Sequence, residues 1–175
     1  MNQENIENND IKNKLECQEF KNPEEIRVKL VAEARDFLGT PFHHEGRIKH
    51  AGVDCGMLLL EVFERAGLIP HIDVKHYPRD FMMHRTEEWY LKIVGAHTRE
   101  LNGGPYLPGD VILFKHGRVF SHGGIITEWP MIIHASSQDR CVCEADATSH
   151  PLHHLKRKIF RHKNLWADSL EQKTV

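Results

Sequence analysis

The run from Cys55 to Ala66 is apolar on nearly all sides and constrains the fold more than any other segment. Three charged residues interrupt it, and Gly67 and Pro70 close it. Its apolar members are Met57, Leu58, Leu59, Leu60, Val62 and Phe63. A helix that is apolar on most of its circumference is covered on several sides. We therefore predict a central core helix that begins at Cys55.

Segments on both sides of this run predict the elements that cover it. Asn22-Pro23 followed by Glu25 is typical of a helix start, and apolar residues continue at helical spacing to Gly39. The segment 40–53 is expected to be a loop, and a further helix is expected over 86–95. After Gly104 the apolar period changes to two, which predicts strands at 110–115, 119–127, 131–135, 140–145 and 158–162. This order of elements indicates an α+β fold, with an antiparallel sheet packed on the core helix.

The length and the ends of the chain suggest its domain organisation. The chain has 175 residues, enough for one domain with its own core. We place this domain at 22–166. Residues 1–21, rich in Asn, Glu and Lys, are expected to be a flexible lead-in, and 167–175 a C-terminal tail.

Charge and hydropathy exclude several classes of function. The formal net charge is −2, so nothing draws the chain toward nucleic acid over a distance. No apolar stretch approaches the roughly 18 residues that span a bilayer, so no membrane span is expected. The polar, acidic N-terminus does not resemble a secretory signal. We therefore expect synthesis in the cytoplasm, and something other than an N-terminal signal would carry the protein to any target outside.

Cys55 is the candidate nucleophile. It follows Asp54 and precedes Gly56, at the junction of a loop and the core helix. Helix N-termini stabilise the thiolate, which is the reactive form of cysteine. The alternative is that Cys55 is a small buried core residue, as free cysteines often are.

Two histidines on predicted strands are the candidate partners of this thiol. His122 follows Ser121 and precedes two glycines, and His134 stands between Ile133 and Ala135. An imidazole near the thiol can take its proton and later deliver it to a leaving amine, which would be the role of His122. His134 would hold the first imidazole in the right tautomer. Since the chain has 14 histidines, either one could instead be an ordinary structural residue.

Metal binding is the rival use of the histidines and cysteines. No C-x-x-C pair and no H-E-x-x-H motif occur, and the loop histidines lack the spacing of metal ligands. Cys141 and Cys143 share one face of a predicted strand and are expected to be packing residues. We expect no metal and no cofactor.

These segments together resemble the NlpC/P60 family of cysteine peptidases, especially its phage-tail-associated branch. The likeness runs from about Ile26 to about Arg161. It is carried by Leu38-Gly39-Thr40-Pro41-Phe42, Asp54-Cys55, Leu107-Pro108-Gly109-Asp110-Val111-Ile112-Leu113-Phe114, Ser121-His122 and Ile133-His134-Ala135.

The resemblance implies a papain-like fold and hydrolysis of stem peptides in bacterial peptidoglycan. The bond cleaved would join D-glutamate, through its γ-carboxyl, to a diamino acid. The nucleophile would be Cys55, with His122 as general base and His134 as the orienting third member. Asp54 would face the amino end of the substrate, and the amide of Cys55 would help hold the oxyanion. A phage or prophage tail would bring the enzyme to the cell wall, and tail proteins would be its partners.

The sequence departs from the family pattern beside the nucleophile. Gly56 stands where many members have a serine that helps to bind the substrate amine, and Met57 follows it. Phe42 lacks the phenol of the tyrosine that many members carry there. Besides the peptidase, two alternatives remain open: an amidase or acyl-transfer enzyme of the same fold acting on another amide, and a decayed module for tail assembly or interaction.

Overall fold

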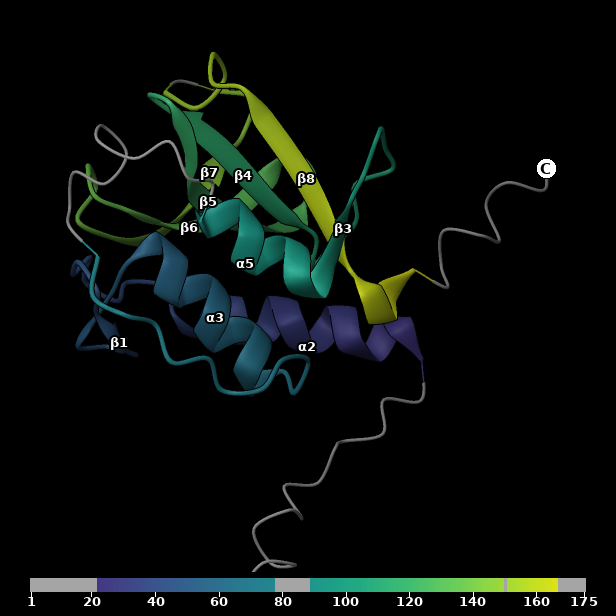
Figure 1. The fold of residues 1–175 in the computed structure, drawn as a ribbon, viewed down its shortest axis with the longest axis horizontal. Helices are drawn as coiled ribbons and strands as arrows, with labels where there is room; N and C mark the ends of the chain where they lie inside the picture. Colours follow the sequence, from purple (N-terminus) through teal and green to yellow (C-terminus); the bar gives the residue numbers. More distant parts are fainter. Residues whose placement is uncertain (1–21, 78–88, 150, 167–175) are drawn as a thin grey trace, which may run out of the picture.

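An antiparallel sheet of six strands carries the helices on one of its faces (Figure 1). The computed structural model describes residues 22–77, 89–149 and 151–166. The strands, in their order across the sheet, are β3 (Thr98–Glu100), β8 (Arg157–His162), β4 (Val111–His116), β5 (Val119–Glu128), β6 (Met131–Ser136) and β7 (Cys141–Asp146). The helices are α2 (Pro23–Asp36), α3 (Cys55–Arg65) and α5 (Trp89–His97), and a short 3-10 turn, η1 (Lys163–Leu165), follows the last strand. This architecture confirms the predicted α+β, papain-like fold.

Helix α2 begins where the sequence predicts. The side chain of Asn22 caps it by accepting a hydrogen bond of 2.9 Å from the backbone N–H of Glu25. The helix ends at Asp36, and Gly39 then adopts a φ of +78°, which suits glycine. Leu30 and Ala34 are fully buried, so one face of α2 is part of the core.

Helix α3 is the central helix that the apolar run predicts. Leu58 and Val62 are fully buried, and the apolar residues around them are nearly so. Asp54 caps the helix, because its carboxylate accepts hydrogen bonds from the N–H groups of Gly56 and Met57 at 3.1 and 2.9 Å. The cap fixes the first turn, and with it the position of Cys55.

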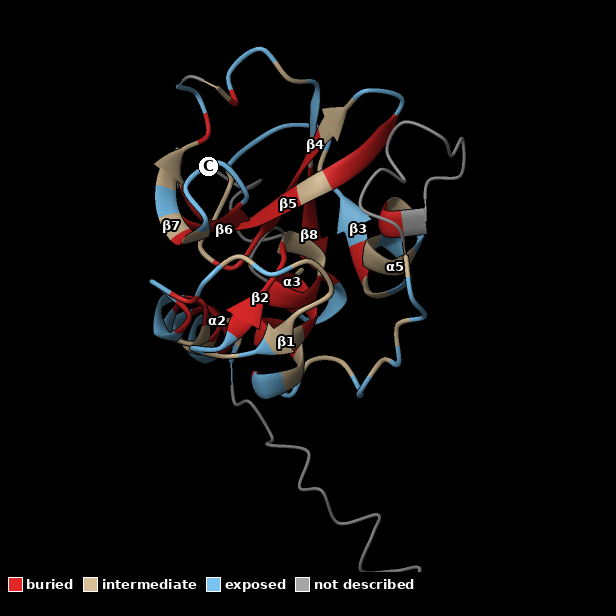
Figure 2. Ribbon diagram, turned by 90° about the vertical axis from the view of Figure 1, so that its left-hand side faces the viewer, coloured by how far each residue is buried: buried red, intermediate tan, exposed pale blue. Residues whose placement is uncertain are grey.

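The two faces of the sheet have separate cores, which follow from the alternation of side chains along each strand. The face toward the helices contributes Val111, Leu113, Ile125, Ile133 and Phe160 to the main core. The opposite face buries Ile112, Phe114, Ile126, Ile132 and Ile159 under Ala147 and Leu152. Most of the sheet is therefore buried on both sides (Figure 2).

Asp110, in the Pro-Gly-Asp turn before β4, links the helices to the sheet. Its carboxylate is fully buried and accepts two hydrogen bonds from Arg161 on β8, at 2.9 and 2.8 Å. Arg27 of α2 contacts the same carboxylate at 3.5 Å. Buried charges are tolerated only when they are paired in this way.

Some elements differ from the predicted ones. The expected loop 40–53 contains a small hairpin, β1 (Arg47–Ile48) with β2 (Gly52–Val53), and the short edge strand β3 was not predicted. Helix α5 continues two residues past the predicted end, and its expected start at 86–88 lies outside the described residues. The expectations for 1–21 and 167–175 also lie outside them.

Candidate active site

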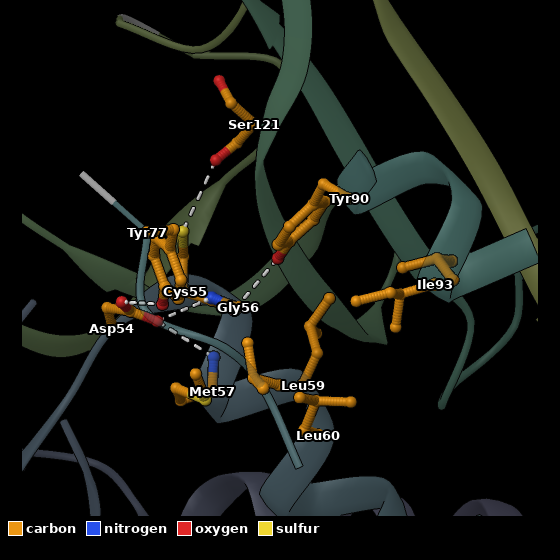
Figure 3. A pocket seen from close by; sticks show the side chains of 12 residues that line it. Asp54, Cys55, Gly56, Met57, Leu59, Leu60, Tyr77, Tyr90, Ile93 and Ser121 are labelled. Atoms are coloured by element: carbon orange, nitrogen blue, oxygen red, sulfur yellow. Dashed lines mark hydrogen bonds between the residues drawn. The ribbon is translucent and has the colours of Figure 1, made fainter. Parts of the chain in front are cut away.

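The thiol of Cys55 lies at the first residue of α3, against the backbone of β5 (Figure 3). Its sulfur donates a hydrogen bond to the carbonyl oxygen of Ser121, at 3.6 Å. The cavity beside it is apolar and is lined by Leu59, Val74, Tyr77, Tyr90 and Ile93, among other residues. The nucleophile is therefore partly buried and faces an apolar cavity.

Burial affects the pKa of this thiol more strongly than the helix N-terminus does. Burial, together with the charge of Asp54, raises the pKa of Cys55 to about 12. The N–H of Gly123 and the hydroxyl of Tyr90 act in the opposite direction and lower the pKa of the thiol. At neutral pH the thiol is protonated, so it needs a base before it can attack.

Asp54 has its carboxylate turned into the protein. One oxygen caps α3, and the other accepts hydrogen bonds from the N–H of Glu45, at 2.8 Å, and from the hydroxyl of Tyr77. The residue is only 3% exposed. The structure thus gives Asp54 a structural role, and its expected contact with the amino end of a substrate stays a prediction.

The two candidate histidines form a hydrogen-bonded pair across neighbouring strands. Nε2 of His122 on β5 lies 2.8 Å from Nδ1 of His134 on β6. The strand register makes this possible, because Gly124, two residues after His122, is paired with His134. Burial lowers the pKa of both imidazoles, and the neighbouring His134 lowers the pKa of His122 further, because two cations would repel. Both rings are therefore neutral at pH 7, and His122 can act as a base.

The thiol and the imidazole pair have different neighbours around β5. The ring of His122 packs near Phe114 and His116, with centroid separations of 5.9 and 5.6 Å, on the face that points away from α3. A β-bulge at Ser121 precedes it, since Phe114 pairs with His122 but Lys115 pairs with Phe120. Within the described part of the chain, the sulfur bonds to the Ser121 carbonyl and not to an imidazole.

A cysteine that the sequence assigns to packing touches the histidine pair. Sγ of Cys143, on β7, lies 3.7 Å from Nε2 of His134 and 3.8 Å from a carboxylate oxygen of Asp139. The charge of Asp139 opposes the effect of burial on the pKa of His134. The period-two pattern placed Cys143 on the correct strand but gave no sign of this contact.

Comparison with known proteins decides the family. The sequence profile described as the NlpC/P60 family matches residues 39–160, which is most of the chain. The chain belongs to the NlpC/P60 family. No curated protein sequence matches it.

Several solved NlpC/P60 structures share the fold. NlpC1 from Trichomonas vaginalis is 19% identical with a TM-score of 0.59, over 83% of this chain and 45% of NlpC1. The NlpC/p60 domain of the peptidoglycan hydrolase SagA is 17% identical with a TM-score of 0.52, over 76% of this chain and 97% of that one. RipD from Mycobacterium tuberculosis is described as a non-catalytic NlpC/p60 domain protein. It is 14% identical with a TM-score of 0.52, over 78% of this chain and 96% of RipD. This chain thus spans about half of NlpC1 and nearly the whole of the other two.

The remaining predicted site residues of this NlpC/P60 domain lie around the thiol with different exposures. Gly56 and Ser121 line the cavity of Cys55, and the buried hydroxyl of Ser121 has no hydrogen-bond partner in the described part of the chain. Phe42 is half-buried against the main core and pairs with Val53, so it does not reach the cavity lining. Phe42 is therefore part of the core beside β2 and not of the cavity that Cys55 faces.

Two tyrosines beside the thiol were not singled out from the sequence. Tyr77 donates to Asp54, and Tyr90, on α5, donates a hydrogen bond of 3.1 Å to the carbonyl oxygen of Cys55. Their positions in the chain are distant from the family motifs, so no motif pointed to them. The unusual glycine at position 56 was the one available signal, because its missing side chain leaves room for Tyr90.

Neither a metal site nor a spanning helix is found where the structure describes the chain. No group of three His, Cys, Asp or Glu side chains is arranged there to hold a metal ion. No helix among those same residues is long and apolar enough to cross a bilayer.

Proposed function

We propose that this NlpC/P60 domain is a cysteine peptidase that cleaves the stem peptides of peptidoglycan, at the bond between γ-linked D-glutamate and a diamino acid. The hydrogen-bonded pair of His122 and His134 carries the proposal, because one ring holds the other in a defined orientation. The thiol of Cys55 is bonded to Ser121, the residue directly before His122. The three groups are thus gathered around one peptide of β5.

The proposed reaction begins when the thiol leaves the Ser121 carbonyl and gives its proton to Nδ1 of His122. This nitrogen is the available one, since Nε2 is engaged by His134. Catalytic hydrogen bonds are often long or misaligned without substrate and tighten when it binds. The thiolate then attacks the amide carbon, the C–N bond breaks, and His122 returns the proton to the leaving amine. Water, deprotonated by His122, hydrolyses the thioester and restores the thiol.

The oxyanion of this reaction would be held at the start of α3. The carboxylate of Asp54 takes the N–H groups of Gly56 and Met57, whereas the N–H of Cys55 has no intrahelical acceptor. This donor would hold the negative charge that develops on the substrate oxygen, and one such donor contributes about 10²-fold or more to kcat.

The proposal is tested with purified muropeptides. The wild type is expected to split stem peptides, and Cys55→Ala is expected to release none above background. Cys141→Ala, which removes a half-buried thiol outside the site, should retain wild-type activity. Equal activity of the wild type and Cys55→Ala, or none in either, would falsify the proposal.

A second candidate function is a non-catalytic wall-binding or assembly module. The thiol–carbonyl bond of Cys55 favours it, because no imidazole touches the sulfur in the described residues. RipD, a structural neighbour, is described as such a non-catalytic domain adapted to peptidoglycan binding. Cosedimentation with purified cell walls separates the two functions: a module of this kind binds the walls and releases no peptide fragments.

We also propose that a phage or prophage tail delivers the protein to the cell wall. The likeness of its motifs to the phage-tail-associated branch supports this placement. Mass spectrometry of purified phage particles from the source bacterium is expected to detect the chain together with tail proteins. Its absence from such particles would remove this part of the proposal.

A further inference from the structure

Tyr90 projects from α5 onto the nucleophile (Figure 3). Its side chain is only 6% exposed, and its hydroxyl donates a hydrogen bond of 3.1 Å to the carbonyl oxygen of Cys55. The phenol therefore reaches the first residue of α3 from a helix that lies far from Cys55 in the sequence.

Two glycines make room for this side chain. A Cβ added at Gly56 would lie 3.0 Å from Cε2 of Tyr90, and one added at Gly123 would lie 2.7 Å from its hydroxyl oxygen. The contact at Gly123 is too short for packed atoms, and the one at Gly56 would require the ring to shift by a few tenths of an ångström, so a side chain at either position would displace the phenol. Gly56 is also the position at which the sequence departs from the family pattern. The departure is explained by the presence of Tyr90.

We propose that Tyr90 is a further catalytic residue, whose hydroxyl donates a hydrogen bond to the sulfur of Cys55 as the thiolate forms. The inference rests on the proposed peptidase function, in which Cys55 is the nucleophile. It also supplies a phenol beside the thiol, where Phe42 has none and lies away from the cavity. The hydroxyl needs only a small movement, from the carbonyl of Cys55 to the sulfur of the same residue.

The surroundings of the sulfur explain why such a donor is needed. The cavity is apolar, and burial raises the pKa of Cys55 to about 12, so an unassisted thiolate is costly. Three donors favour the thiolate: the N–H of Gly123, the hydroxyl of Tyr90 and the N–H of Cys55 itself. Burial, with the nearby charge of Cys55 and Asp54, raises the pKa of Tyr90 well above its ordinary value. The phenol therefore keeps its proton through the reaction and acts only as a donor.

The test replaces Tyr90 by phenylalanine, which keeps the ring and removes the hydroxyl. A hydrogen bond to a charged group is worth on the order of 2 kcal/mol, so kcat on muropeptides should fall by about tenfold or more with little change in KM. The second readout is alkylation of Cys55 by iodoacetamide at pH 9, followed by mass spectrometry of the peptide that contains it. Its rate should fall by about tenfold, because less thiolate is present at a given pH.

Two further variants accompany this test, one as a control and one as a second way to displace the phenol. Tyr106→Phe is the matched control, since Tyr106 packs edge-on against Trp129 in the core of the far face, and it should leave both readouts unchanged. Gly56→Ala displaces the ring of Tyr90 without threatening α3, because alanine is a better helix former than glycine. It should lower the alkylation rate of Cys55 in the same direction as Tyr90→Phe.

The alkylation readout separates this inference from the proposed function. If the wild type cleaves muropeptides but Tyr90→Phe matches it in kcat and in alkylation rate, the role of Tyr90 is overturned and the peptidase stands. If the wild type cleaves nothing, the peptidase fails, and slower alkylation in Tyr90→Phe still shows the hydrogen bond to the sulfur. Unchanged alkylation in both Tyr90→Phe and Gly56→Ala overturns the inference in either case.

Discussion

The two faces of the sheet differ in the chemistry that they place around β5. The helix side encloses Cys55 in an apolar cavity of about 50 Å³, whereas the far side opens into a polar hollow of about 710 Å³ beside His122 and His134. Only the second has the size of a typical ligand site. The thiol therefore lies beside a narrow apolar cavity, whereas its proposed base lines the wider hollow.

This difference shows what each face contributes to a reaction. A thiol without a solvated surrounding reacts only when a base takes its proton, so the helix side suppresses unwanted chemistry. The far side holds a neutral imidazole in a fixed orientation. Each of the following variants changes the residues of one side.

Removing the imidazole of His122 from the far face should have the largest effect on activity. His122→Ala is expected to lower kcat/KM on muropeptides by about 10³-fold, within the range for loss of a general base. His71→Ala is the matched control, because that side chain is 63% exposed, bonds to Glu64 on α3 and has no place in the reaction. It should stay within threefold of the wild type. If His122→Ala retains more than a tenth of the activity, the far face does not supply the base.

The helix side should show the largest effect on stability. Asp110→Ala leaves Arg161, which is 1% exposed, without its paired carboxylate. Breaking such a buried pair costs about 4 kcal/mol in the free energy of unfolding, measured by urea denaturation. Asp146→Ala removes an exposed carboxylate on the rim of the far hollow, whose partners are Thr148 and Ser149, and should lower the free energy of unfolding far less. Similar losses in the two variants would contradict the difference between the faces.

Much of this architecture could be predicted from the sequence, because the signals were local. The apolar run after Cys55 predicted α3, and the cap at Asn22 predicted α2. The period-two segments predicted five strands to within a residue or so at each end. The strands β1, β2 and β3 have two or three residues each and were missed, since a pattern that short has no period to detect.

The site was less predictable, because its details depend on contacts between distant segments. Spacing placed His122 and His134 on adjacent strands, and the structure brings them together. The orientation of His122 relative to Cys55 depends on which face each strand residue occupies near the bulge, which the sequence did not show. Tyr90 and Cys143 reach the site from other elements, so no motif near the nucleophile could have identified them.

Acidification should lower the free energy of unfolding through His162, which lies on the helix side of the sheet. Burial, with the nearby charge of His97, lowers the pKa of His162 to about 4, while an unfolded histidine titrates near 6.5. The unfolded state then binds more protons between these values, so stability is complete above pH 6.5 and is lost as the pH falls toward 4. The loss amounts to about 3 kcal/mol, at about 1.4 kcal/mol for each unit.

The matched variant for this pH effect is His162→Gln, which keeps a hydrogen-bond acceptor for the N–H of Asn164 and does not titrate. The free energy of unfolding, measured by urea denaturation, should differ less between pH 7.5 and pH 5 for this variant than for the wild type. A difference as large as that of the wild type would assign the acid sensitivity to other groups, including the imidazoles of the far face.

The smallest effect on activity is expected at Cys143, which contacts His134 on the side away from His122. Cys143→Ala removes a sulfur that lies 3.7 Å from His134, and hydrogen bonds to sulfur are weak. The thiol is also protonated at neutral pH, because burial and Asp139 raise the pKa of Cys143 to about 11. We expect kcat/KM to fall by about threefold or less. A loss near that of His122→Ala would mean that the orientation of His134 depends on β7, and the far face would then act as one network in which the pair is only the inner part.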